Sequence, residues 1–339
     1  MAFLDFSLPK ELIAQTPAQP RDHSRLMVLH RDTGQIEHRH FYDLPGYLQE
    51  GDVLVLNDTR VLPARLKGQK EGTGGRVEAL LLKDEGDGLW RAMVKPGKRL
   101  PVGARVVLGG LEAEVAGREP DGTRLLRFPP GAAVLEAGQV PLPPYIHTPL
   151  QDPERYQTVF SRRPGGLAAP TAGLHFTPEL LAQLRAKGVE TVFITLHIGP
   201  GSFRPAGEGE NLPEEYGEIS PEAARSLTRA RKEGKRIIAV GTTCTRLLEQ
   251  AATAEAIGPF QGWTGLLISP GHVFRGVSAL VTNFHFPRST HLLLVNAFCG
   301  EDLVKSAYEE AIRLRYRFYS FGDCMVILQD GRSGRRTWS

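Results

Sequence analysis

The sequence predicts an α/β (α+β) protein, in which a larger mixed α/β domain carries a smaller inserted domain of antiparallel β-barrel-like form. A chain of 339 residues with 41% hydrophobic content is long for one domain and can bury a sizeable core. From about residue 150 strand and helix patterns alternate, as in α/β proteins, whereas from about 65 to 140 Gly and Pro punctuate short strand patterns. We therefore expect a major domain of residues 1–64 and 146–339, and a small β-rich domain of residues 65–145.

The first part of the chain supplies short elements. Residues 9–15 favour a helical turn, and residues 25–30 and 52–56 favour strands, the second of them apolar and buried. The small domain then offers five further strand patterns, and its end is marked by a proline-rich stretch. These patterns lie at residues 76–82, 89–94, 105–108, 111–115 and 124–128, and the proline-rich stretch at residues 140–146.

The second half has clear helix starts. Thr177-Pro178-Glu179 and Ser220-Pro221-Glu222 each place a capping hydroxyl before a proline and an acid. Glycines end both helices, and a further helix is expected from about Asp302 to Arg315. We expect the stretch Gly207–Gly217 to be a mobile loop that binding orders. The expected strands cover residues 192–196, 236–240, 265–268 and 325–328.

Composition narrows the class of protein. The net charge of +3 permits a nucleic-acid partner without demanding one. The three cysteines are widely spaced, so neither a disulfide framework nor a thiolate zinc site is expected. There is no signal-peptide pattern and no apolar run of the ~20 residues that a membrane helix needs. We therefore expect a cytoplasmic protein.

Six short polar clusters follow predicted strands or precede predicted helices, where α/β proteins place their sites. Each cluster alone also fits a structural role, such as a tight turn, a helix cap or a structural histidine. A metal site at His38 and His40 is disfavoured, because no carboxylate or third histidine stands nearby. The clusters are residues 21–25, 57–60, 168–177, 196–203, 241–246 and 282–290.

Three histidines in these clusters are candidates for proton transfer near neutral pH, namely His175, His197 and His285. If the last cluster is extended, Asn283 and His285 share one face, while the neighbouring phenylalanines share the other. Ser289 or Thr290 is then expected to cap the next helix.

A strand–turn–helix pattern surrounds Gly241. Its helix start would present free backbone N–H groups to a carboxylate or a phosphate. The glycine spacing matches neither a dinucleotide-binding fingerprint nor a P-loop, and capping by the threonines is the structural alternative.

The order of the clusters is more specific than any one of them. Arg-Asp-x-Ser-Arg-Leu, Asn-Asp-Thr-Arg-Val-x-Pro-Ala-Arg-Leu, Ala-Ala-Pro-Thr-Ala-Gly-Leu-His-Phe-Thr, Gly-Thr-Thr-x-x-Arg-x-Leu-Glu, Thr-Asn-Phe-His-x-Pro-x-Ser-Thr and Tyr-Arg-Phe-Tyr-Ser-x-Gly-Asp occur in succession. This order resembles the S-adenosylmethionine:tRNA ribosyltransferase-isomerase family of queuosine biosynthesis. The resemblance runs from Asp5 to about Leu328 and is weakest in the β-rich segment. It also implies a two-domain body with a β-barrel-like smaller domain.

The resemblance implies that the ribosyl moiety of S-adenosylmethionine is transferred to 7-aminomethyl-7-deazaguanine at the wobble position of a tRNA and isomerised. Epoxyqueuosine forms, and adenine and methionine leave. S-adenosylmethionine is thus a consumed co-substrate, and no cofactor or metal is implied. The sulfonium acidifies the neighbouring 5′ C–H, so an imidazole base suits the first step. The partners are this tRNA and S-adenosylmethionine, without a membrane, and a monomer is favoured.

On this resemblance we hypothesise that His285, then His175 and His197, are the general-base candidates. We expect Gly241, Thr242, Thr243 and Arg246 to hold the methionine carboxylate, and Asp58 and Asp323 to hold ribose hydroxyls or the sulfonium. Arg21, Arg25 and Arg60 are expected to face tRNA phosphates. The remaining substrate-binding candidates are Asn57, Thr171, Asn283, Ser289 and Thr290.

Two positions depart from the family pattern. Leu212-Pro213-Glu214-Glu215 stands where similar proteins usually carry Met-His-x-Glu, so Pro213 replaces a histidine while Glu215 is kept. We infer that this histidine is not the general base. Gly201-Ser202-Phe203 replaces Gly-Thr-Phe and preserves the hydroxyl.

Two other functions stay open at this point. A conventional S-adenosylmethionine methyltransferase would release S-adenosylhomocysteine, but the first strand lacks a glycine-rich turn. A catalytically silent RNA-binding module would bind tRNA without needing the three histidines. The near-neutral charge suits a specific RNA enzyme better than a general RNA binder.

Overall fold

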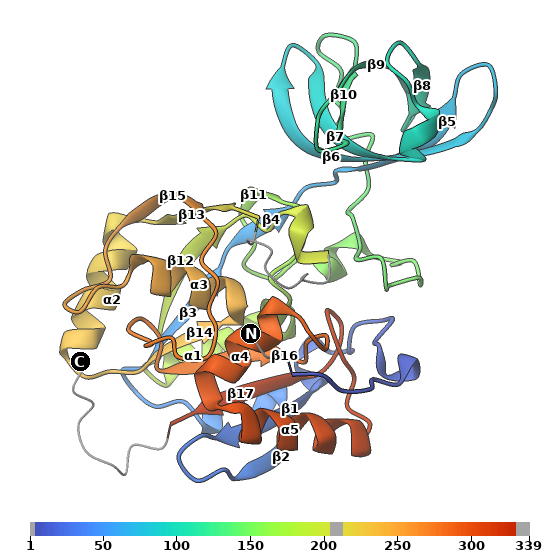
Figure 1. The fold of residues 1–339 in the computed structure, drawn as a ribbon. Coiled ribbons are helices and arrows are strands. Elements are labelled where there is room, and N and C mark those ends of the chain that lie inside the picture. The colour runs from blue at the N-terminus through green and yellow to red at the C-terminus, as the bar shows by residue number, and fades with distance from the viewer. Residues whose placement is uncertain (1–3, 204–212, 330–339) are drawn as a thin grey trace. The chain divides into compact units, whose positions relative to one another are not determined.

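A computed structural model describes residues 4–203 and 213–329 and divides the chain into two compact units (Figure 1). Val61–Leu142 and Pro164–Ala168 form the smaller unit, and the remaining described residues form the larger one. The larger unit holds a nine-stranded mixed sheet, and the smaller unit is a closed six-stranded antiparallel barrel. The predicted fold class, a mixed α/β body with an inserted β-barrel, is confirmed.

The large sheet has the strand order β15-β13-β12-β3-β14-β16-β17-β1-β2. Its strands are β1 (Arg25–His30), β2 (Ile36–His40), β3 (Val53–Asn57), β12 (Glu190–Leu196), β13 (Glu215–Ile219), β14 (Ile237–Val240), β15 (Phe260–Thr264), β16 (Ala279–Asn283) and β17 (Cys324–Leu328).

Strand direction brings several strand ends to one edge of this sheet. β12, β3, β14 and β16 run parallel, whereas β17 is antiparallel to β16 and parallel to β1. The carboxyl ends of the first four strands therefore meet the amino ends of β17 and β1, and we call this side of the sheet the motif edge. The register places Asn283 beside Cys324, and Cys324 beside Leu26.

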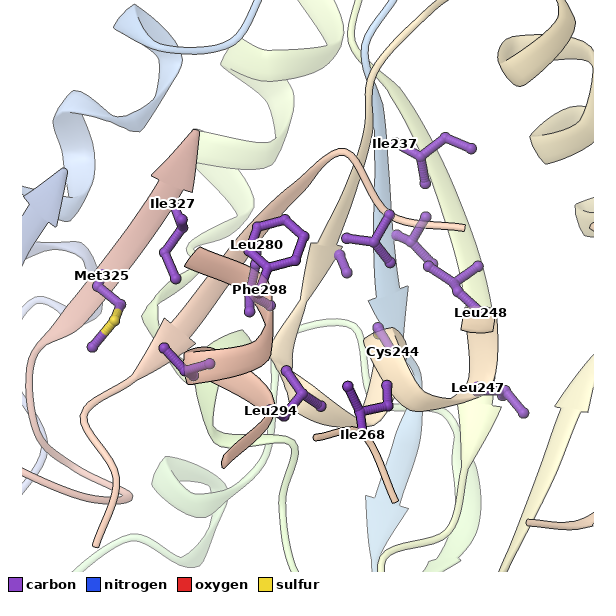
Figure 2. Close-up of a cluster of buried hydrophobic side chains, with 14 of the residues drawn as sticks. Ile237, Cys244, Leu247, Leu248, Ile268, Leu280, Leu294, Phe298, Met325 and Ile327 are labelled. Carbon is purple, nitrogen blue, oxygen red and sulfur yellow. The ribbon is translucent and has the colours of Figure 1, made fainter. Parts of the chain in front are cut away.

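One face of the sheet is covered by four helices. They are α2 (Pro221–Lys232), α3 (Gly241–Ala251), α4 (Thr290–Cys299) and α5 (Glu301–Arg313). Alternate strand residues such as Val55, Ile194 and Leu280 pack against apolar residues of these helices in one core cluster. Figure 2 shows part of this cluster: Phe298 of α4 lies beside Leu280 of β16, with Met325 and Ile327 of β17 on one side and Cys244 and Leu247 of α3 on the other.

The opposite face has its own core cluster. Residues of the intervening positions, such as Leu54, Ile238 and Val326, pack against α1 (Pro178–Ala186) and the 3-10 helix η3 (Phe41–Gly46). Among the described residues this cluster contains none from β13 or β15. The helical cover on this face therefore does not extend over that end of the sheet.

The smaller unit encloses a separate core. Its strands close in the order β10-β7-β6-β5-β8-β9, and inward residues such as Leu66, Val77 and Val115 are buried. The strands are β5 (Arg65–Lys70), β6 (Arg76–Gly86), β7 (Leu89–Lys95), β8 (Arg105–Leu108), β9 (Leu111–Arg118) and β10 (Arg124–Arg127).

Short elements complete the chain. They are the 3-10 helices η1 (Lys10–Leu12), η2 (Arg21–His23), η4 (Gly97–Arg99), η5 (Pro153–Tyr156), η6 (Thr171–His175) and η7 (Pro200–Phe203), and the paired strands β4 (Thr59–Val61) and β11 (Arg163–Gly166). None of the helices in the part of the chain described is long and apolar enough to cross a membrane.

Two local predictions were wrong. Residues 265–268, expected to form a strand, form none; the strand β15 ends just before them, at Thr264. The loop predicted over Gly207–Gly217 overlaps β13, which begins at Glu215 and pairs with both β12 and β15. The first six residues of that predicted loop lie outside the described residues. β13 is held as a strand by backbone hydrogen bonds to the strands on both of its sides. Its short, polar sequence alone does not predict a strand.

Candidate active site

The six polar clusters lie at the motif edge of the larger unit, except that Ala168, the first residue of the cluster 168–177, belongs to the smaller unit. Residues 57–60, 196–203, 241–246 and 282–290 follow the carboxyl ends of β3, β12, β14 and β16, and residues 21–25 lead into β1. The sixth cluster forms η6 and joins them through hydrogen bonds to Ser24 and Asn283. Segments that are far apart in sequence thus meet in one place.

A buried polar network connects three of the clusters. The Asn283 side-chain amide donates to the Tyr319 carbonyl (3.3 Å) and to His175 Nε2 (3.1 Å), while its oxygen accepts from the Thr171 hydroxyl (2.9 Å). His175 Nδ1 lies 2.7 Å from the hydroxyl of Ser24. Because the Tyr319 carbonyl can only accept, the amide nitrogen must face it, and His175 Nε2 is then an acceptor.

His175 is therefore neutral, with its proton on Nδ1 and directed to Ser24. Burial lowers the pKa of this imidazole to about 3, and the charges of Arg317 and Arg21 act in the same direction. The ring also stacks on Phe41, with centroids 5.0 Å apart. Both ring nitrogens are occupied by protein groups, so the geometry favours a positioning role over direct proton transfer.

Two residues at the end of β3 tie the neighbouring strands together. The amide of Asn57 donates to the Leu196 carbonyl (2.9 Å) and lies 3.4 Å from the Thr243 hydroxyl, and its oxygen accepts from the Leu196 N–H (3.1 Å). The buried carboxylate of Asp58 accepts from Thr195 (2.6 Å) and from Arg162 Nε (2.7 Å). These contacts fix the strand ends around the site.

His197 is half-buried at the end of β12. Its Nδ1 lies 2.9 Å from the Thr59 hydroxyl, and its backbone N–H donates to the Tyr216 carbonyl (2.9 Å). Burial lowers its pKa, opposed in part by Asp58. Within the described residues Nε2 has no hydrogen-bond partner, so one nitrogen of a neutral ring stays available.

His285 lies just beyond the end of β16 and is half-buried. The strand ends at Asn283, so the extended face that these two residues were predicted to share does not continue to His285. His285 Nε2 lies 2.8 Å from the Thr282 hydroxyl, and its backbone N–H donates to the Tyr308 hydroxyl (2.9 Å). Burial and the neighbouring His291 hold the pKa of His285 well below its ordinary value.

His291 is a site residue that sequence reasoning missed. It lies in the first turn of α4, and its ring stacks on that of His285 with centroids 5.3 Å apart and an interplanar angle of 18°. Burial and the charge of Arg246 lower its pKa to about 4. Ser289 caps α4 as predicted, accepting from the Leu292 N–H. Thr290 is the first residue of that helix.

The amino end of α3 begins directly at the end of β14. Gly241 has φ of +90°, and no side chain caps this helix. Thr242 and Thr243 are buried in its first turn. The first N–H groups of a helix lack intrahelical acceptors, so this turn suits an anionic group.

Arg246, one turn further along α3, is engaged by protein groups. Its NH1 lies 2.6 Å from Glu215 Oε2, and its other nitrogens donate to the carbonyls of Leu266 (3.0 Å) and Thr264 (3.4 Å). The second oxygen of Glu215 accepts from the Gly199 N–H (2.9 Å). This arrangement couples α3 and β13 to the loop after β12, and it leaves the guanidinium poorly placed to bind a carboxylate.

The remaining charged candidates are also held internally. Asp323 accepts from the backbone N–H groups of Arg25 (2.9 Å) and Arg317 (2.8 Å). Arg25 donates to the Leu314 carbonyl and lies over the ring of Tyr316, and Arg21 donates to the Leu174 and Glu154 carbonyls. Arg60 contacts Ser161 and Glu154. The guanidinium groups of Arg21, Arg25 and Arg60 are therefore already bonded to protein groups.

Known proteins resemble this chain over nearly its whole length. A family model described as "Queuosine biosynthesis protein" matches residues 1–327. The S-adenosylmethionine:tRNA ribosyltransferase-isomerases of Moorella thermoacetica and Symbiobacterium thermophilum are 52% and 53% identical to it, each over 96% of this chain and 98% of the relative. The crystal structure of the S-adenosylmethionine tRNA ribosyltransferase from Thermotoga maritima is 42% identical, with a TM-score of 0.57, and covers 96% of this chain and 99% of its own.

Proposed function

The chain belongs to the queuosine biosynthesis family of S-adenosylmethionine:tRNA ribosyltransferase-isomerases, and we propose that the motif edge of its larger unit is where the reaction takes place. The activity is transfer and isomerisation of the ribosyl moiety of S-adenosylmethionine onto 7-aminomethyl-7-deazaguanine in tRNA, forming epoxyqueuosine and releasing adenine and methionine. The observation that carries the assignment of the site is the convergence of six sequence clusters at one sheet edge.

The methionine carboxylate of the substrate binds at the amino end of α3. The uncapped N–H groups of Gly241, Thr242 and Thr243 are the natural donors, and the helix dipole favours a negative charge there. Arg246 does not contact the carboxylate in this proposal. Its contacts with Glu215 and two backbone carbonyls hold the first turns of α3 in place.

His285 is the general base of the first step. Its pKa lies well below neutrality, so the ring is neutral and ready to accept the acidic 5′ proton next to the sulfonium. The imidazolium formed in this way is a strong acid and gives up its proton readily, which suits protonation of departing adenine. The stacked ring of His291 fixes the orientation of His285.

His175 positions Asn283 rather than moving protons. Its neutral ring accepts from the Asn283 amide and donates to Ser24, and the amide oxygen is held in turn by Thr171. Because each of these groups is held by the next, the hydrogen bonds fix the orientation of the Asn283 side chain.

A product assay tests the proposed function. Purified protein is incubated with S-adenosylmethionine and tRNA carrying 7-aminomethyl-7-deazaguanine, and the small molecules and the RNA are analysed by mass spectrometry. We expect free adenine and methionine with a matching mass gain on the tRNA. Release of S-adenosylhomocysteine would show methyl transfer instead, and binding without turnover would show an RNA-binding module.

A further inference from the structure

Three aromatic side chains form a row across one end of the large sheet. His197, Tyr216 and Trp263 come from the end of β12, from β13 and from β15, and the register places Tyr216 directly opposite Trp263. The rings of His197 and Tyr216 are stacked with centroids 6.2 Å apart, and those of Tyr216 and Trp263 meet edge to face at 5.8 Å. The row therefore starts in the candidate active site and runs out to the sheet edge.

The outer end of this row is open to solvent. Trp263 is 64% exposed, more than any other large hydrophobic residue in the described part of the chain. On the opposite face of β13, the space beside Gly217 is filled by Leu247 of α3. On the face of the row, the core cluster beneath α1 includes no described residue of β13 or β15. Trp263 therefore continues, through Tyr216, a row of rings that reaches solvent at this end of the sheet.

Two exposed arginines, each paired with a carboxylate, lie beside this end of the sheet. Arg162 directly precedes β11, and Arg163 is its first residue. Their side chains are 61% and 52% exposed, respectively. Asp58 anchors Arg162 Nε, and the Arg162 guanidinium lies over the Phe193 ring; Glu218 of β13 holds Arg163. Anchored arginines beside exposed rings suit a ligand that carries both phosphates and flat bases.

We propose that His197, Tyr216 and Trp263 form a stacking platform for unpaired anticodon-loop nucleotides next to the modified base, while Arg162 and Arg163 contact the loop phosphates. The inference rests on the proposed function, because it uses the tRNA substrate of that same site. A single-stranded loop is the occupant that fits, since its bases present π-faces to aromatic side chains and its backbone carries negative charge. His197 also lies in the candidate active site, so binding of the loop would deliver the wobble base to the motif edge.

The first test compares Trp263→Ala, Trp263→Phe and Tyr42→Ala. Tyr42 is the comparison residue, because it is an exposed aromatic in η3, beside β2 at the other end of the strand order, where its ring contacts those of His23 and His40. The dissociation constant for an anticodon stem–loop RNA carrying 7-aminomethyl-7-deazaguanine is measured by fluorescence anisotropy. We expect Trp263→Ala to raise Kd about 5- to 100-fold, with kcat at saturating RNA changed by less than about twofold. Trp263→Phe should recover most of the affinity, and Tyr42→Ala should leave it unchanged.

A spectroscopic test reads stacking directly. The chain contains three tryptophans, so replacing Trp90 and Trp338 by Phe leaves Trp263 as the sole indole. Titration with the stem–loop should quench its fluorescence with the same Kd that anisotropy gives. Absence of quenching in a variant that still binds the RNA would overturn the platform.

The outcomes separate this inference from the proposed function. If the wild type releases adenine and Trp263→Ala keeps the wild-type Kd, the platform is wrong while the function stands. If the wild type releases no adenine but Trp263→Ala weakens RNA binding, the function fails and the surface stands. A Trp263→Ala variant that loses a concentration-dependent dimer while keeping its RNA affinity would show that a second copy of the chain occupies the surface.

Discussion

The three candidate histidines differ in what holds their ring nitrogens. His175 has both nitrogens bonded to protein groups, whereas in the described residues His197 and His285 each use one ring nitrogen. A general base needs a free lone pair within reach of the proton that it abstracts. We therefore propose a positioning role for His175, and we keep His285 and His197 as the candidates for proton transfer.

Replacing His285 by Gln should remove proton transfer without unfolding the protein. The side chain is only half-buried, and an amide can still contact the Thr282 hydroxyl. We expect kcat for adenine release to fall about 10²- to 10⁴-fold, the usual contribution of general acid–base catalysis. His147→Gln, at an exposed histidine, is the control and should retain wild-type kcat. A His285→Gln enzyme within about threefold of wild type would remove His285 from the mechanism.

Replacing His175 by Gln should instead change stability and its pH dependence. In the folded state the His175 pKa is about 3, below the ~6.5 of an unfolded chain, so the unfolded state binds more protons between these values. Stability is therefore lost as pH falls through 6.5 toward 3. This residue alone should cost about 1.5 kcal/mol between pH 6.5 and pH 5.

Urea unfolding of both proteins at pH 7.5, 6.5 and 5 checks this prediction. His175→Gln should be less stable at pH 7.5 by about 1–3 kcal/mol, because Ser24 or Asn283 loses a partner. Its further loss of stability at pH 5 should be smaller than that of the wild type. Equal losses in the two proteins would mean that His175 titrates normally in the folded state.

At the scale of single residues, the sequence predicted which residues lie at the site better than it predicted their hydrogen-bond partners. Gly-rich polar clusters after apolar strands indicated a site, and the structure brings all of them together. Whether a guanidinium such as that of Arg246 is free or already bonded depends on residues 31 and 18 positions away, Glu215 and Thr264. His291 was missed for a similar reason, since only the turn from β16 into α4 stacks it on His285.

At the scale of elements, the junction of β14 and α3 depends on one backbone conformation. Gly241 has φ of +90°, which residues with a Cβ adopt only at a cost of roughly 1–2 kcal/mol. The space around its missing Cβ is otherwise sufficient, because the nearest atoms, of Thr243 and Ala172, lie at 3.5 and 3.6 Å. Backbone strain is thus the main effect of adding a methyl group there.

Gly241→Ala and Gly234→Ala form a matched pair that tests this junction. Gly234 ends α2 with φ of +68°, and no atom lies within 4 Å of the position that an added methyl group would take, so its backbone penalty is comparable. Both variants should lose roughly 1–2 kcal/mol of stability. Only Gly241→Ala should raise KM for S-adenosylmethionine, by about tenfold or more, because it displaces the N–H groups proposed to bind the carboxylate. Equal KM values would place that carboxylate elsewhere.

Element prediction succeeded where local chemistry decides. The Thr177 and Ser220 caps, each followed by proline, start α1 and α2 as predicted, and both side chains accept the expected N–H. β13 was missed because its sequence, Glu-Tyr-Gly-Glu-Ile, has few apolar residues and owes its strand form to pairing on both sides. Such non-local pairing leaves little trace in a short segment.

At the scale of the whole molecule, the two units have separate cores. With the exception of Ala168, the residues assigned to the motif edge belong to the larger unit. The change of composition near residues 65 and 140 revealed the inserted barrel, because short strands between close turns need Gly and Pro. The order of the nine strands could not be read in this way, since it depends on pairings between distant segments.

Separate cores predict separable unfolding, which calorimetry can test with two core variants. Leu66→Ala removes a fully buried side chain from the barrel and Leu54→Ala removes one from the large sheet, each at a cost of about 2–5 kcal/mol. We expect each variant to lower the melting temperature of its own unit only. Saturating S-adenosylmethionine should raise the transition of the larger unit alone, because ligand that binds one folded unit stabilises that unit. Leu66→Ala should therefore retain wild-type affinity for S-adenosylmethionine. A single transition that both variants and the ligand displace equally would show instead that the two units unfold as one.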